Sequence, residues 1–124
     1  MPEWEFQISP VAASRPRLSR RGAYLTGPYK QFRKDMIDLA EEVLGDWEPM
    51  LGLLHVDIEL YIKQPKKTKL DVPRADVDNF IKAILDSLNG YLWEDDRQIK
   101  SVYAIKQWAP KNQDGYFTIG VDKC

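Results

Sequence analysis

Apolar and polar residues alternate in several parts of the chain, and this alternation predicts strands. The clearest case spans residues 54–62, where every second side chain is apolar, as expected for a strand with one buried face. Residues 4–8 alternate in the same way and predict a first strand. Residues 99–108 and 116–121 are expected to form two final strands, paired as a hairpin across residues 110–115.

Two other stretches place apolar residues at helical spacing. The first begins at Pro28 and ends at Gly45. The second follows Asp76, a favourable N-cap, and ends at Asn89–Gly90. The resulting order, strand–helix–strand–helix–strand–strand, predicts an α+β fold. We expect a single domain over residues 1–124, with two main helices packed on one small mixed β-sheet.

The composition is that of a globular protein. Of the 124 residues, 44% are hydrophobic, which is too many for a disordered chain. No apolar run approaches the roughly 20 residues of a membrane span, and no signal peptide pattern is present. Cys124 is the one cysteine, which excludes an intrachain disulfide and a Cys-rich zinc site. We therefore expect a cytoplasmic protein that has no membrane partner.

The net charge of −1 conceals an uneven distribution. Residues 1–34 hold seven Lys/Arg and two acids, whereas residues 35–62 hold eight acids and no Lys/Arg. Residues 63–74 hold five Lys/Arg and one acid, and residues 75–124 hold six against eight. Because phosphate binding depends on local rather than total charge, the two basic segments permit nucleic-acid binding.

Both basic segments are predicted to be loops. Pro and Gly interrupt residues 10–27, which we interpret as one long loop whose arginines grip phosphates and whose Tyr24 stacks on a base. The lysines of residues 63–69 precede the second helix, where they could attract a DNA backbone. A solvated loop is the competing interpretation of each segment. The candidate DNA-binding residues are Arg15, Arg17, Arg20, Arg21, Lys66, Lys67, Lys69 and Arg74.

The second helix carries the candidate chemistry. Asp76 lies at its start, where the helix dipole favours negative charge. At about 100° per residue, Asp78, Lys82 and Asp86 fall on one flank. Asp95–Asp96 follow a short turn and are expected to fold back toward that flank. Carboxylates gathered in this way favour a hard divalent cation such as Mg²⁺, and the natural chemistry of such a site is phosphodiester hydrolysis.

Each piece of this pattern also has a purely structural interpretation. Asp76 and Asp78 suit helix capping, and Asp78 with Lys82 suits a favourable i,i+4 pair. Residues 94–96 suit a solvated turn. One strand face offers a rival set of metal ligands, although a solvated sheet surface explains it more simply. The members of this set are His55, Asp57 and Glu59.

The order and spacing of residues 74–99 resemble the signature of the RusA family of Holliday junction resolvases. The matching positions are Asp76-x-Asp78-Asn79, Lys82, Asp86-x-Leu88-Asn89-Gly90 and Trp93-x-Asp95-Asp96-x-Gln98-Ile99. The resemblance implies a small homodimeric endonuclease that requires Mg²⁺, with Mn²⁺ as a substitute, and nicks four-way or otherwise branched DNA junctions symmetrically. It also implies roles for individual residues. The metal-binding catalytic acids would be Asp76, Asp78 and Asp96, the basic catalytic residue Lys82, and the accessory candidates Asp86 and Asp95.

The family includes phage and prophage members, so the resemblance implies DNA recombination or repair in a bacterial or phage-infected host cell. Some members have a basic residue directly before the first aspartate, where this chain has Ala75, with Arg74 one place earlier. Two alternatives remain open. A non-catalytic module for branched or single-stranded DNA would bind junctions without regard to Mg²⁺. A metal-dependent hydrolase of small phosphates would leave the basic segments unexplained.

Overall fold

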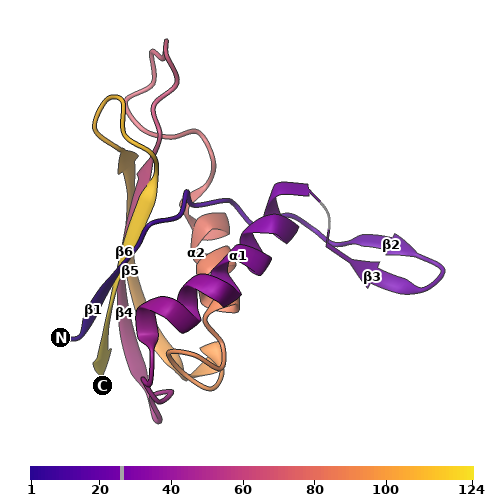
Figure 1. Ribbon diagram of the computed structural model, residues 1–124, viewed down its shortest axis with the longest axis vertical. Helices are drawn as coiled ribbons and strands as arrows, with labels where there is room; N and C mark the ends of the chain where they lie inside the picture. Colours follow the sequence, from indigo (N-terminus) through magenta and orange to yellow (C-terminus); the bar gives the residue numbers. More distant parts are fainter. Residues whose placement is uncertain (26) are drawn as a thin grey trace.

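The computed structural model describes residues 1–25 and 27–124. Its elements in chain order are β1 (Glu3–Phe6), β2 (Arg17–Ser19), β3 (Gly22–Tyr24), α1 (Gly27–Leu44), β4 (Leu54–Ile62), α2 (Val77–Ser87), the 3₁₀ turn η1 (Asp96–Gln98), β5 (Ile99–Trp108) and β6 (Tyr116–Lys123). Four strands form one sheet in the order β1-β6-β4-β5, and β2 pairs with β3 separately. Both helices lie on the same side of the four-stranded sheet (Figure 1). The predicted α+β fold, with two main helices on a mixed sheet, is confirmed.

β4 is a central strand of the sheet. It runs parallel to β5 and antiparallel to β6. The predicted hairpin between the last two strands is wrong, because β4 lies between them. Alternate side chains of β4 are fully buried, so one face of this strand lies against the core. These side chains are Leu54, Val56, Ile58 and Leu60.

The connection from β5 to β6 crosses the end of β4. Two inter-strand spacings of roughly 4.8 Å separate β5 from β6, and residues 109–115 span that distance. The N–H of Ala109 donates to the Ile62 carbonyl at 2.7 Å, which fixes the start of the crossing. At Gly115 an added Cβ would lie 2.9 Å from the Tyr61 carbonyl oxygen, so the close approach requires glycine.

The helices bury their apolar stripes against one face of the sheet. The buried core residues of α1 are Tyr29, Phe32, Met36, Ala40 and Leu44, and those of α2 are Phe80, Ala83 and Ile84. The predicted helix boundaries are confirmed to within two residues, and Gly45, with φ of +56°, follows α1 in the left-handed conformation. Neither α1 nor α2 combines the length and apolar character that a membrane-spanning helix needs.

The interpretation of residues 10–27 as one long loop is wrong in its middle. There β2 and β3 form a hairpin that extends away from the sheet and helices (Figure 1). Ser19 pairs with Gly22, so Arg20 and Arg21 form the turn, and Gly22 has φ of +112°. Every residue of both strands is exposed, so the hairpin buries no face and leaves no hydrophobic period to detect. Thr26, in the same interval, lies outside the described residues.

Candidate functional site

Asp76 is the N-cap residue of α2, as predicted, but its side chain does not cap the helix. Its backbone is extended, with φ of −66° and ψ of 137°. The side chain makes no capping hydrogen bond to the first turn, and the residue is exposed. The carboxylate is therefore available for another role, at the end of the helix where the dipole favours negative charge.

Asp78 and Lys82 are also exposed and do not pair with each other. Within residues 1–25 and 27–124, the ion pairs closer than 4.0 Å are His55–Asp57 and Lys63–Asp114. The i,i+4 ion pair that a purely structural interpretation expects is therefore not formed. One carboxylate and one ammonium thus remain on the flank of α2 with their charges uncompensated at that distance.

Asp96 folds back toward α2, as the sequence predicts. Asp96 lies close to Asp95 and to Asp86, which is half-buried on α2. Burial is the main cause that raises the pKa of Asp96, and the neighbouring carboxyl groups of Asp95 and Asp86 raise it further. Ionised Asp96 is therefore held in unfavourable surroundings that a bound cation would relieve.

A capping box holds the turn that presents Asp96. Asp95 accepts a hydrogen bond from the Arg97 N–H at 3.0 Å, and this bond lowers the pKa of Asp95. The Gln98 side-chain oxygen accepts from the N–H groups of Glu94 and Asp95, at 2.9 Å and 3.0 Å. Asp95 thus caps the η1 turn, a structural role that explains this acid without catalysis.

Gln98 also attaches the turn to the loop that precedes β4. Its Nε2 donates to the Met50 carbonyl at 2.9 Å and to the Gly52 carbonyl at 3.0 Å. Gln98 thereby satisfies four backbone groups and fixes where η1 lies. Gln98 belongs to the family signature, but the sequence alone could not reveal this attachment, because Met50 and Gly52 are more than 40 residues away.

Lys106, on β5, is a residue of the site that the sequence pattern did not reveal. Its ammonium donates to the Ala75 carbonyl at 2.7 Å, directly before Asp76. Two residues along the strand, the indole N–H of Trp108 donates to the Leu70 carbonyl at 3.0 Å. Alternation along β5 predicts that these two side chains share a face. The sequence pattern does not show that both side chains contact residues 70–75, the segment before α2.

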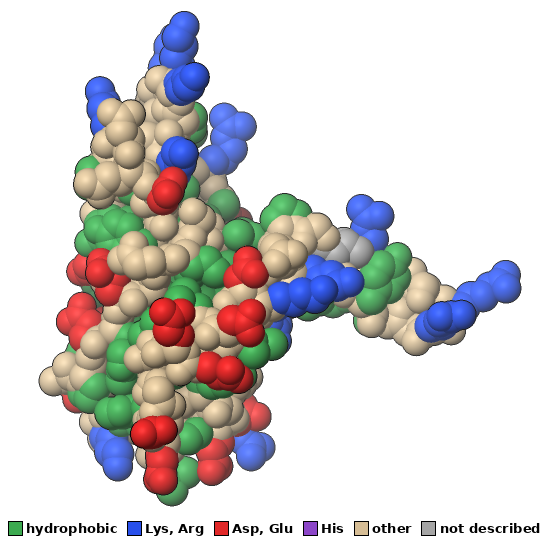
Figure 2. Space-filling view, in the orientation of Figure 1, with side chains coloured by type: hydrophobic (Ala, Val, Ile, Leu, Met, Phe, Trp, Pro, Cys, Tyr) green, Lys and Arg blue, Asp and Glu red, His purple; other side chains and the backbone are tan. Residues whose placement is uncertain are grey.

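The predicted basic residues lie in two separate places. The N–H of Ala13 donates to the Asn79 carbonyl at 2.9 Å, so the chain leading to Arg15 passes the first turn of α2. The remaining arginines of this segment follow on the exposed hairpin. Figure 2 shows basic side chains on the hairpin and around the loops at one end of the sheet, whereas acidic side chains gather over α1. Arg74, two residues before Asp76, is exposed.

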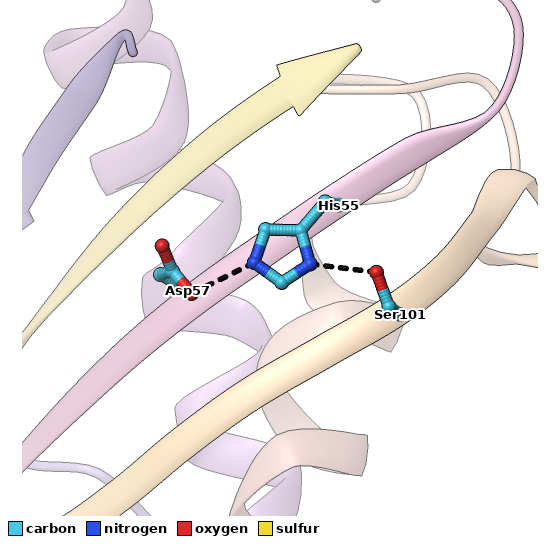
Figure 3. Close-up of polar contacts among 3 residues, drawn as sticks. All are labelled: His55, Asp57 and Ser101. Atoms are coloured by element: carbon cyan, nitrogen blue, oxygen red, sulfur yellow. Dashed lines mark hydrogen bonds and ion pairs between the residues drawn. The ribbon is translucent and has the colours of Figure 1, made fainter. Parts of the chain in front are cut away.

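The rival residues on β4 lie on the sheet face opposite the core. The His55 ring is held between Asp57, at 2.9 Å from Nε2, and Ser101, at 2.6 Å from Nδ1 (Figure 3). Glu59 instead accepts a hydrogen bond from the Tyr61 hydroxyl at 2.8 Å, and this bond is the main reason that the pKa of Tyr61 rises to about 12. These contacts link neighbouring side chains on an open surface.

No group of three or more His, Cys, Asp or Glu side chains in the described part of the chain is arranged to hold a metal ion. The β4 set therefore gains no support as a metal site. The structure likewise does not gather Asp76, Asp78 and Asp96 into a preformed cluster. The chemistry of the α2 and η1 donors nevertheless suits Mg²⁺, since they offer carboxylate oxygens, one crowded pair and one acid that is not used as a cap.

A family model described as endodeoxyribonuclease RusA matches residues 7–114. The match spans the arginine-bearing hairpin, both helices, the lysine-rich loop and the η1 turn. No curated protein matches the chain.

Proposed function

The chain belongs to the RusA family of endodeoxyribonucleases, and from this premise we propose that it resolves Holliday junctions by paired, symmetric cleavage that depends on Mg²⁺. The proposal rests on how the structure places two acids, Asp76 and Asp96. Asp76 occupies the N-cap position without capping, and Asp96 is crowded against Asp86. The crowding of Asp96 opposes its ionisation, and the Asp76 carboxylate is not used as a cap, so a bound cation would account for both.

The proposed metal ligands are the carboxylates of Asp76, Asp78 and Asp96. Asp86, which lies beside Asp96, is an accessory acid of the site. When bound, Mg²⁺ would polarise the scissile phosphate and lower the pKa of an attacking water. The side chains of the protein do the remaining work. Lys82, with no acid within 4.0 Å among the described residues, stabilises the negative charge that grows on the phosphoryl oxygens. The capping box at η1 keeps Asp96 in place.

Several further features belong to the same proposal. Symmetric cutting of a four-way junction needs two sites related by a two-fold axis, so we propose a homodimer. Mn²⁺, which also takes oxygen ligands, would substitute for Mg²⁺. The proposed setting is the cytoplasm of a bacterial or phage-infected cell, where the enzyme would act in recombination or repair.

The test is cleavage of a synthetic four-way junction, beside a linear duplex and a single strand of the same sequence. We expect paired nicks at symmetric positions in the junction alone, with Mg²⁺ or Mn²⁺, and no nicks in EDTA. Cleavage in EDTA, or equal cleavage of linear duplex, would contradict the proposal. Tight junction binding without nicks in Mg²⁺ would favour a non-catalytic branched-DNA module instead.

A further inference from the structure

A cleft of about 830 Å³ opens between two loops at the end of the sheet where β4 and β5 finish. Its walls are residues 63–69, from the connection between β4 and α2, and residues 111–112, from the connection between β5 and β6. Five lysines line it: Lys63, Lys66, Lys67, Lys69 and Lys111. Figure 2 shows basic side chains projecting around this end of the molecule. Lys111 comes from the opposite wall and was not among the residues predicted to bind DNA.

Both walls are attached to the folded core. Gln64 donates its side-chain N–H to the Ala109 carbonyl at 2.9 Å, which joins the bases of the two loops. The indole of Trp108 holds the Leu70 carbonyl at 3.0 Å, just beyond the last lysine of the first wall. The cleft therefore has a fixed frame, and its charged side chains extend from that frame into solvent.

The lining favours an extended polyanion over a small ligand. All five lysines are exposed, and the nearest compensating acid, Asp114, lies 3.5 Å from Lys63 in a pair that is itself largely exposed. Exposed lysines bind phosphates through local charge and counterion release, without fixing the orientation of one small molecule. The apolar enclosure that usually holds a small ligand is missing from the residues that line the cleft.

We propose that this two-loop cleft binds the phosphate backbone of one arm of the DNA substrate, with Lys111 contacting it from the wall opposite Lys66 and Lys67. The proposal rests on the proposed function for the identity of the DNA. The first wall continues through Leu70 to Asp76, so a short stretch of chain connects the cleft to the start of α2. The cleft would therefore set the position of the arm relative to the acids.

The experiment compares two double variants of the full chain. Lys67→Gln with Lys111→Gln removes one charge from each wall, and Lys100→Gln with Lys123→Gln removes two exposed charges from the opposite end of the sheet. Junction affinity is measured in EDTA over a series of salt concentrations. We expect the cleft variant to bind about 10-fold more weakly and its slope of log K against log[salt] to be shallower by about 2, since each phosphate contact contributes roughly 0.9. The control variant should change neither.

Equal effects of the two variants, or no effect of the cleft variant, would overturn the proposal. The proposed function is tested separately by Mg²⁺-dependent cleavage with the unaltered protein. If the protein binds DNA through the cleft but never cuts a junction, the cleft proposal stands and the proposed enzymatic function is wrong. If the unaltered protein cuts junctions but the cleft variant has the same slope of log K against log[salt], the enzymatic function stands and the cleft proposal is wrong.

A second inference concerns Lys106 and rests on its own contact. The lysine is half-buried, donates to the Ala75 carbonyl at 2.7 Å, and has no acid within 4.0 Å among residues 1–25 and 27–124. A cation at the start of a helix opposes the helix dipole, which is ordinarily unfavourable. We infer that Lys106 is a positioning residue that fixes the peptide before Asp76, and this inference also rests on the proposed function.

Lys106→Met tests this role, with Lys100→Met on the same strand as the control. In metal-free protein we expect Lys106→Met to lower the hydrogen-exchange protection of the Asn79 amide, which bonds to the Asp76 carbonyl at 3.2 Å. For cleavage we expect kcat to fall about 10-fold or more with KM for the junction nearly unchanged, because a misplaced acid affects chemistry more than binding. Lys106→Arg, which keeps the charge and donors, should recover part of kcat. Unchanged protection and kcat, or a loss confined to KM, would overturn the inference.

Discussion

Replacing Asp78 by Asn is expected to abolish junction cleavage while leaving junction binding largely intact. The substitution preserves size and removes one proposed metal-binding charge. Metal-assisted polarisation supplies several kcal/mol of the barrier reduction, so the cleavage rate should fall by roughly 10³-fold or more. Asp78 is exposed and has no ion pair within 4.0 Å among the described residues, so the fold should not suffer. The measurement is single-turnover cleavage in Mg²⁺, beside junction affinity in EDTA.

The matched control for this variant is Asp38→Asn, on the exposed face of α1. This variant also replaces one aspartate by asparagine, but on α1 instead of α2. We expect it to cleave junctions at the wild-type rate. Retention of cleavage by Asp78→Asn would contradict the assignment of this acid. Loss of cleavage together with loss of junction binding would point to a DNA-binding role for the first turn of α2, rather than to catalysis.

The elements that pack in the four-stranded sheet or against it could be predicted from the sequence, whereas the exposed β2–β3 hairpin could not. The alternation of β4 and the apolar stripe of α2 each reflect burial against the core, so their boundaries were correct to within two residues. The β2–β3 hairpin buries no side chain and therefore has no period to read. The predicted pairing of β5 with β6 failed for a different reason. Chain order favours a hairpin, but alternation within a strand does not encode its neighbours, and β4 lies between β5 and β6.

Some features of the site could also be predicted from local sequence signals, and others could not. The helix start at Asp76 and the return of Asp96 follow from local signals and chain direction, and both are observed. Asp86 is one of the groups that raise the pKa of Asp96, after burial and Asp95, but spacing alone could not distinguish Asp86 from its neighbours on α2. Lys106 reaches Ala75 across 31 residues of sequence. Such a pairing depends on how β5 lies beside the segment before α2, which no local pattern encodes.

Replacing Asp96 by Asn is expected to abolish cleavage and, in the absence of metal, to stabilise the protein. The wild-type carboxylate is partly buried beside Asp86 and Asp95, which raises its pKa. A neutral amide avoids both the burial penalty and the like-charge repulsion. Because the group is partly exposed and solvent screens it, the gain should be modest, with Tm higher by roughly 1–4 °C. Functional sites commonly carry such a cost to stability.

The pH dependence of this gain has a definite sign. A carboxyl whose pKa is raised on folding contributes stability below its unfolded pKa of about 3.9, and that contribution is lost as pH rises through the folded pKa. The difference in Tm between Asp96→Asn and the wild type should therefore be largest near pH 7 and vanish below about pH 4. The measurement is thermal unfolding in EDTA across that range. A variant that is less stable than the wild type at pH 7 would show that the observed crowding is not a strain on the fold.

For Asp95, in the same turn, we expect the opposite effect of substitution on Tm. The Arg97 N–H lowers the pKa of Asp95, so Asp95 contributes stability above its unfolded pKa, and that contribution is lost as pH falls through its folded pKa. Asp95→Ala should therefore lower Tm at pH 7, whereas Asp96→Asn raises it. Added Mg²⁺ should raise the Tm of the wild type, because a ligand bound only by the folded state stabilises it, and should raise that of Asp96→Asn much less. If Mg²⁺ shifts both proteins equally, Asp96 does not bind the metal, and its crowding against Asp86 needs another explanation.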